Sequence, residues 1–372
     1  MERHMNKVKI YLLLGCMIIL LCLSAAGCSG EEAPTRTTLF SQQKNDDVSA
    51  DGKLEVHFID VGQGDATLIK EGDHAMLIDA GENNQGENVT GYLKSQNIRG
   101  LDYVIGTHPD SDHIGGLDVV IDTYDCDKLI MPDVESDTKT YDDVILSMKN
   151  KNMTVTNPEV GDVYSLGDAY FTIIAPNRDY GDDTNNWSVG ILLVFGDNRF
   201  LFTGDAEATA ENDMIANGID LSADVYKAAH HGSKTGSSES FLDEVKPEYS
   251  VISCGENNEY GHPNAQTLNE FRKRGIKVFR TDEQGTIVAV SDGKTISFNM
   301  SPDDSWKSGE PKGSSGKSSV GVRYVLNTNT KKYHRPTCSH VDDIKGENRK
   351  DTSETKSQLE KQGYKPCGVC KP

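Results

Sequence analysis

Cysteine is scarce outside the two ends of this chain. Only Cys126 and Cys254 lie in the body, between residues 53 and 300, because the other six of the eight cysteines fall within the first 28 or the last 35 residues. This distribution excludes a small scaffold held together by several disulfides. The two cysteines of the body form either two buried thiols or a single disulfide, and the sequence leaves both alternatives open.

The sequence also lacks an excess of positive charge and any visible short repeat. Its 38 Lys and Arg against 58 Asp and Glu give a formal net charge of −20. That balance argues against a protein that sits permanently on DNA, RNA or an anionic membrane. Brief contact with a polyanion at a metal site stays open, because bound cations supply local positive charge. With 372 residues, 36% of them hydrophobic, the chain can form a sizeable core.

What the N-terminus does contain is a targeting segment, residues 1–28. A basic start precedes an apolar run from Ile10 to Ala26, and Gly27 and Cys28 follow. Small residues directly before a cysteine resemble the lipid-attachment signal of bacterial lipoproteins, in which Cys28 would carry the lipid; the alternative is an uncleaved membrane anchor. Residues 29–52 are polar and acidic, so we expect a flexible tether. Either alternative predicts that the rest of the chain lies at the extracellular face of the cytoplasmic membrane.

One loop, residues 107–116, offers four metal-capable side chains within six positions: His108, Asp110, Asp112 and His113. On an extended loop, side chains at i and i+2 point the same way. His108 and Asp110 could then bind one cation, with Asp112 and His113 turned towards a second. Two divalent ions roughly 3.5–4 Å apart are the usual arrangement for metal-assisted hydrolysis of phosphate esters. The alternative is a solvated acidic turn.

Further metal-capable residues follow two later strand-like runs. Asp205 could bridge two cations with its two carboxylate oxygens, or could simply cap a helix. His230 and His231 precede a glycine and could be ligands or part of a surface turn. Open α/β sheets place ligands at the carboxyl ends of their strands, which favours one shared site. The runs read as the strands in question are Leu101–Thr107, Arg199–Thr203 and Ala223–Ala228.

Together these motifs resemble the metallo-β-lactamase superfamily, in particular the extracellular hydrolase domain of ComEC-type competence proteins. The resemblance covers most of residues 53–300 and implies a four-layer αββα sandwich with the site at one sheet edge. The stretches that carry it are Phe58–Asp65, Leu77–Gly81, Thr107–Gly116, Thr203–Asp205, Ala229–Ser233 and Tyr260–Pro263.

The resemblance implies a role for each candidate residue. Asp205 would bridge two metals, and Asp79 and Asp65 would orient ligands from behind. His230 would contact a substrate oxyanion, while His262 would bind or protonate a leaving oxygen, unless it is only a loop histidine. The metal ligands implied are His108 and Asp110 for the first ion, Asp112, His113 and His231 for the second, and Asp205 for both.

Two departures from the wider superfamily bear on the metal. Asp110 stands where a histidine is usual, and no histidine occurs near residues 185–188, as in the ComEC-like branch. The first site is therefore richer in oxygen, which moves its preference from zinc towards manganese or magnesium. The two divalent cations could be zinc or manganese.

The last part of the chain predicts a linker, residues 301–319, and a compact unit, residues 320–372. His334, Cys338, Cys367 and Cys370 supply four ligands for a tetrahedral zinc, with His340 as a competing ligand; a redox pair or a disulfide is the alternative. The unit resembles the zinc-binding module of the Ada methylation-repair protein. Because His334 replaces the reactive cysteine of that family, we expect a structural or DNA-contacting role and no methyl transfer.

These observations predict a lipid-anchored extracellular hydrolase that cleaves phosphodiesters, with nucleic acid as the preferred substrate. The groups expected to act in the reaction are Asp112, Asp205, His230 and His262. Three alternatives remain: an esterase for phosphorylcholine on teichoic acid, a lactone or β-lactam hydrolase, and a DNA-binding surface module without catalysis.

Overall fold

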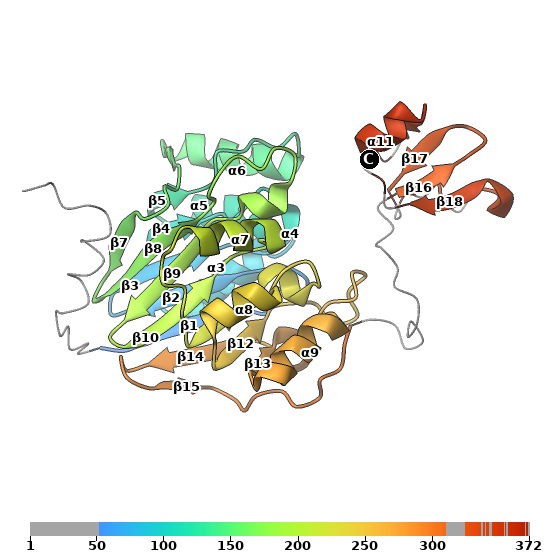
Figure 1. Cartoon of the computed structure of the whole chain (residues 1–372). Coiled ribbons are helices and arrows are strands. Elements are labelled where there is room, and N and C mark those ends of the chain that lie inside the picture. Colours follow the sequence, from blue (N-terminus) through green and yellow to red (C-terminus); the bar gives the residue numbers. More distant parts are fainter. Residues whose placement is uncertain are drawn as a thin grey trace, which may run out of the picture. The chain divides into compact units, whose positions relative to one another are not determined.

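The computed structural model describes residues 52–309 and most of 324–370, except for 336, 337, 339, 342, 343, 353, 355 and 369 (Figure 1). The chain divides into two compact units after Gly309, and each is described by itself. The predicted lipoprotein segment with Cys28, the tether up to residue 51 and positions 310–319 of the predicted linker lie outside the described residues. Within the described part, no helix is both long and apolar enough to cross a membrane.

The first unit contains two mixed β-sheets, of eight and seven strands. The first sheet runs, in spatial order, β15 (Ile296–Phe298), β14 (Ile287–Ser291), β1 (Leu54–Phe58), β2 (Thr67–Glu71), β3 (His74–Ile78), β4 (Leu101–Ile105), β5 (Cys126–Ile130) and β6 (Val155–Thr156). The second runs β13 (Lys277–Arg280), β12 (Tyr249–Ile252), β11 (Val225–Lys227), β10 (Asn198–Phe202), β9 (Gly190–Phe195), β8 (Ala169–Ala175) and β7 (Val163–Leu166).

The two sheets pack face to face over one apolar core. Phe58, Met76 and Ile105 of the first sheet meet Phe171 and Phe200 of the second, and at most 1% of each of these side chains is exposed. Helices cover both outer faces, so central strands such as β9 are apolar over nearly their whole length. The four-layer αββα sandwich is therefore confirmed.

The helices divide between the two outer faces (Figure 1). Those on the first sheet are α3 (Gly86–Ser95), α5 (Leu117–Thr123) and α6 (Lys139–Asn150); those on the second are α7 (Ala208–Ala216), α8 (Glu239–Val245) and α9 (Ala265–Arg274). Each presents an apolar stripe to its sheet, for example Val89 and Leu93 from α3 and Leu268 and Phe271 from α9. The short pieces are α4 (Ser111–Ile114), α10 (Thr281–Gln284), η2 (Thr184–Trp187) and η3 (Ala229–Gly232).

Two expectations from the sequence need correction. The loop 107–116 is not an extended segment, because residues 108 and 109 form a bend and Asp112 and His113 lie on the helical turn α4; Asp110, directly before that turn, has an extended backbone. The linker predicted at 301–319 does not begin at 301, because residues up to Gly309 pack on the body: Trp306 lies under the Arg272 guanidinium, and the Gly309 amide donates to the Pro263 carbonyl.

The two body cysteines lie on different parts of the fold. Cys126 begins β5 and Cys254 follows β12, and both are free thiols. Of the two alternatives that the sequence left open, the structure therefore has the two thiols, although only Cys254 is buried and Cys126 is partly exposed.

In its described residues, the second unit is a small sheet of four strands with one α-helix and one 3-10 turn. Its elements are β18 (Arg349–Thr352), β16 (Tyr324–Asn327), β17 (Lys332–His334), β19 (Lys365–Pro366), α11 (Lys356–Lys361) and η4 (Gly346–Asn348). One row across the sheet joins Arg349, Asn327, Lys332 and Lys365 as successive partners, so these side chains share a face. Its three basic residues are exposed.

Candidate metal centre

Every predicted metal-binding side chain of the body lies beyond the carboxyl end of a strand, at one edge of the sandwich. Strand β4 leads to His108, β10 leads to Asp205, and β11 leads to His231. Close approach of the chain is needed here: a Cβ at Gly64 would lie 2.3 Å from the Asp112 carbonyl oxygen, so only glycine fits. The strand ends and the glycine turn bring residues far apart in sequence into one place.

The centre of the cluster is formed by His113, His231 and Asp205. The Nε2 atoms of His113 and His231 lie 3.3 Å apart, and they lie 3.2 and 3.4 Å from the two Asp205 oxygens, Oδ1 and Oδ2 respectively. Asp112 Oδ2 approaches His231 Nε2 to 3.3 Å. All four residues direct donor atoms at one small volume, and three of them are almost fully buried.

His108 and Asp110 extend the cluster on one side. The His108 and His113 rings are 4.2 Å apart between centroids, and His108 Nε2 lies 3.8 Å from Asp110 Oδ2. His108 Nε2 and Asp205 Oδ1 are buried atoms without a hydrogen-bond partner in the described part of the chain. Because buried polar atoms are otherwise almost always satisfied, this donor set fits cations held by imidazole and carboxylate.

Asp79 fixes the orientation of His113. Its Oδ2 accepts a hydrogen bond from His113 Nδ1 at 2.8 Å and from Thr107 Oγ1 at 2.7 Å, while Oδ1 accepts from the Thr107 amide at 2.8 Å. With Nδ1 committed, His113 turns Nε2 towards the cluster. His231 is held in the same way, since its Nδ1 donates to the Ser253 carbonyl oxygen at 2.9 Å.

Asp65 lies beside the cluster, and its carboxylate is paired with a buried cation. Lys227 Nζ, on β11, is 2.8 Å from Asp65 Oδ2, and both side chains are less than 8% exposed. Asp65 Oδ1 lies 3.3 Å from Nδ1 of His231. This nitrogen is on the edge of the ring that faces away from the other donors. Although one Asp65 oxygen is within 4.8 Å of donor atoms of His113, Asp205 and His231, this geometry supports a role behind His231.

The electrostatics of the cluster follow from burial of opposite charges. Burial disfavours the charged form of Asp205, but His113 and His231 outweigh it and hold the pKa of this carboxyl well below its usual range. Burial likewise works against protonation of His113 and His231, yet Asp205 raises the pKa of both well above the ordinary value. For His108, burial and the neighbouring His113 lower the pKa, which keeps this imidazole neutral.

His230 lies at the outer side of the cluster. Its Nε2 is 3.6 Å from Asp205 Oδ2, its Nδ1 is within 3.5 Å of Glu207 Oε1, and the side chain is 22% exposed. Burial lowers the pKa of His230, whereas Asp205 and Glu207 raise it, and the net shift is upward. His230 and His231 both have positive φ, 48° and 53°, a strained conformation that clusters at functional sites. The structure thus buries His231 within the cluster and leaves His230 partly exposed to solvent.

His262, in the segment between β12 and α9, lies against both histidines. Its ring is 5.4 Å from that of His230 and 6.1 Å from that of His231, between centroids. Burial, together with these two neighbours, lowers the pKa of His262 to about 3. His262 is therefore a neutral imidazole next to the cluster, and its buried Nδ1 has no hydrogen-bond partner among the described residues.

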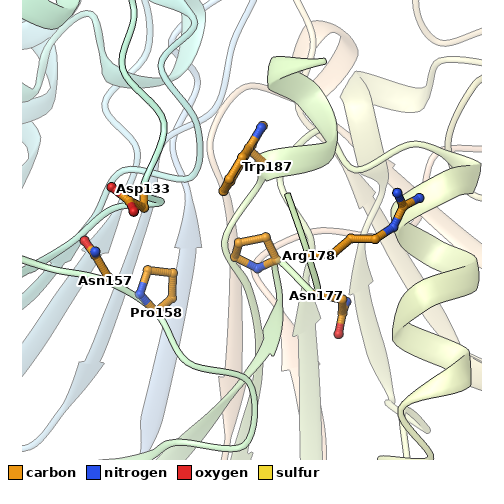
Figure 2. Close-up of a pocket in the computed structure, with 7 residues that line it drawn as sticks. Asp133, Asn157, Pro158, Asn177, Arg178 and Trp187 are labelled. Carbon is orange, nitrogen blue, oxygen red and sulfur yellow. The ribbon is translucent and has the colours of Figure 1, made fainter. Parts of the chain in front are cut away.

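A cavity of about 220 Å³ opens elsewhere on the first unit (Figure 2). Trp187 and Asp133 stand on opposite sides of it, while the Arg178 side chain turns aside to pair with Asp213 at 2.7 Å. Trp187 directly precedes Ser188, whose hydroxyl lies 3.4 Å from His108 Nδ1. The residues that line the cavity are Asp133, Asn157, Pro158, Pro176, Asn177, Arg178 and Trp187, none of which belongs to the metal cluster.

The second unit holds a cluster of its own. One ligand atom from each of His334, Cys338, Cys367 and Cys370 lies within 4.8 Å of the others. His334 Nδ1 is buried without a hydrogen-bond partner in the described residues, and burial lowers the pKa of this imidazole, as suits a metal ligand. Three sulfurs and one nitrogen fit a closed tetrahedral zinc site. The competing residue His340 is exposed and lies outside the group.

Comparison with known proteins agrees with the geometry. The family model described as "Metallo-beta-lactamase superfamily" matches residues 59–256. This chain belongs to that superfamily. The metallo-β-lactamase fold protein YhfI from Bacillus subtilis has a TM-score of 0.41 and 15% identity, covering 63% of this chain and 99% of that one.

Among curated proteins, this superfamily member is related to competence proteins. It is 29% identical to ComE operon protein 3 of Bacillus subtilis (strain 168) over 67% of this chain and 34% of the relative. It is 30% identical to Recombination protein 2 of Haemophilus influenzae over 63% of this chain and 28% of the relative. The chain thus spans about a third of the length of these relatives.

Reasoning from sequence missed several residues that surround the candidate metal centre. Lys227 lies in a run that the sequence predicts as an apolar strand. A lysine in such a run, just before a histidine pair, was the signal by which it could have been recognised. Ser188 stands near the place of the absent histidine, and its hydroxyl accepts from the Asp205 amide at 3.0 Å. Glu207, beside His230, gave no signal because it reads as the start of a helix.

Proposed function

We propose that this protein is a metal-dependent hydrolase of phosphodiesters at the cell surface, with nucleic acid as its substrate. The observation that carries the proposal is the buried set of imidazole and carboxylate donors at one edge of the sandwich. His108 and Asp110 would hold one divalent cation, Asp112, His113 and His231 a second, and Asp205 both. When bound, such cations supply Lewis acidity, which stabilises charge on a phosphate and lowers the pKa of a water.

The residues of the chain itself divide the remaining tasks. Asp79 and the Ser253 carbonyl keep His113 and His231 in the tautomer that offers Nε2 to a cation. His230, which is partly exposed, can donate a hydrogen bond to an oxyanion that develops on the substrate. His262 is neutral, so we assign it to binding the leaving oxygen through a ring N–H.

Three observations support nucleic acid as the substrate. One curated relative is named Recombination protein 2 and another Competence protein ComA, the oxygen-rich first site suits manganese or magnesium, and a zinc-type cluster in the second unit gives a module separate from the hydrolase. The location follows from the sequence: Cys28 would carry a lipid and hold the protein at the outer face of the cytoplasmic membrane.

The test uses the chain from residue 29 onwards with manganese, magnesium or zinc. Substrates are single- and double-stranded DNA, bis-p-nitrophenyl phosphate, a phosphorylcholine ester and a chromogenic β-lactam. We expect cleavage of DNA and of the aryl diester. In Asp112→Ala, turnover should fall more than about 100-fold, beyond the 10–100-fold typical of residues that only orient ligands.

The control is Asp137→Ala, which removes an exposed carboxylate from the loop before α6. It should keep wild-type turnover. Cleavage confined to the phosphorylcholine ester or the β-lactam would replace the proposal by one of those activities. No turnover with any metal, together with retained DNA binding, would leave a binding module.

A further inference from the structure

Tyr260 is a large apolar side chain left exposed beside the candidate metal centre. In the described residues, the large hydrophobic side chains that stand out to solvent are Leu146, Val163 and Tyr260, at 57%, 40% and 67%. Tyr260 is the most exposed and the one aromatic ring among them. Single exposed apolar residues are common, so exposure alone does not indicate a function for Tyr260, and its position is what matters.

That position is at the end of a column of rings. The Tyr260 ring lies 5.7 Å from the His262 ring at an interplanar angle of 25°, and His262 lies 6.1 Å from His231 at 28°. Three rings, each tilted by less than 30° from the next, therefore lead from a metal-donor histidine to the surface. Burial, together with the carboxylates of Asp112 and Glu82, raises the pKa of Tyr260.

The backbone around Tyr260 is held in place by one side chain. Asn258 Oδ1 accepts from the amides of Tyr260 and His262, at 3.1 and 3.0 Å. Asn258 Nδ2 donates to the carbonyl oxygens of Gly255 and His262, at 2.9 and 2.6 Å. Four hydrogen bonds thus order the loop before any ligand binds, so little entropy is lost on binding.

We infer that Tyr260, with His262 packed behind it, forms a stacking subsite for a flat heteroaromatic ring, a nucleobase, next to the phosphate that is cleaved. The inference rests on the proposed function and narrows its substrate class. The exposed Tyr260 face takes the ring and the metal cluster takes the phosphate, so the enzyme distinguishes nucleotide chains from diesters without bases. Stacking of this kind tolerates every base, because each has a π-face.

The experiment compares a single-stranded oligodeoxyribonucleotide with an abasic oligomer of the same length. We expect wild-type kcat/KM to be higher on the base-bearing chain and Tyr260→Ala to remove that preference. The loss should be between about 5- and 150-fold, which corresponds to about 1–3 kcal/mol at 1.4 kcal/mol per tenfold. Tyr260→Phe keeps the ring and should keep the preference.

The matched control is Leu146→Ala, which trims another exposed apolar side chain, on α6, and should change neither substrate. Binding of both oligomers is also measured by fluorescence anisotropy in an Asp112→Ala background, with and without Tyr260→Ala. Equal cleavage and equal binding of the two oligomers would overturn the subsite. If no metal gives cleavage but the base-dependent binding disappears with Tyr260→Ala, the subsite stands and the hydrolase proposal fails.

Discussion

Replacement of Asp79 by asparagine tests whether a carboxylate behind His113 prepares the metal centre. The substitution keeps the size of the side chain, and asparagine tolerates the positive φ of 58° at this position. An amide NH2 facing His113 Nδ1 would move the ring proton to Nε2, the atom that points at the cluster. The lost hydrogen bond to a charged group is worth about 1.5–3 kcal/mol, so metal affinity should fall about 10- to 100-fold.

The assay is calorimetric titration with Mn²⁺, because thiolate-rich sites such as that of the second unit disfavour this ion. A matched control exists on the same sheet: Asp102 accepts from His74 Nδ1 and from the Ala75 amide, both at 2.8 Å, away from the cluster. Asp102→Asn should leave the Mn²⁺ affinity unchanged. If Asp79→Asn binds Mn²⁺ like the wild type while keeping its melting temperature, the assigned orienting role is wrong.

Three more predictions concern stability and the second cluster. Lys227→Met leaves the Asp65 carboxylate buried without its partner and should lower the free energy of unfolding by about 3–5 kcal/mol in urea, an effect that adding Asp65→Asn should partly reverse. Burial raises the pKa of Glu211 to about 7 from 4.5, so the folded state keeps a proton that the unfolded chain releases. Stability should therefore fall by about 3 kcal/mol as the pH rises from 4.5 to 7, and Glu211→Gln should flatten this slope. His334→Ala should lower the bound zinc by one ion per chain and make residues 324–370 sensitive to protease, while a wild-type proteolysis pattern would contradict a zinc-held unit.

The metal donors could be proposed from sequence because their signal is local. Four donors within residues 108–113 form a pattern on their own, and a histidine pair after an apolar run is similarly compact. The strands also follow from apolar runs bounded by turns, and their ends shift by at most two residues in the structure. What the pattern could not give was the helical turn α4, because four residues are too few for a helical period.

Other features depend on partners far away in the chain. Asp65 and Lys227 are 162 positions apart, and nothing in either segment indicates the other. Residues 301–309 have the composition of a linker, yet Trp306 and the backbone of Gly309 find partners on the body. The composition of a segment indicates whether that segment can form a core of its own. It does not indicate whether the segment packs on a core that other segments form.

The exposed basic row of the small sheet shows that charge is distributed unevenly along the chain. Residues 320–372 carry 11 Lys and Arg against 6 Asp and Glu, while residues 53–309 carry 20 against 45. The chain is therefore a strongly acidic unit and a mildly basic one, and the total of −20 describes neither. Separated fragments should bind opposite ion exchangers at neutral pH. Repulsion of polyanions by excess negative charge is therefore expected at the sandwich and not at the row formed by Arg349, Lys332 and Lys365.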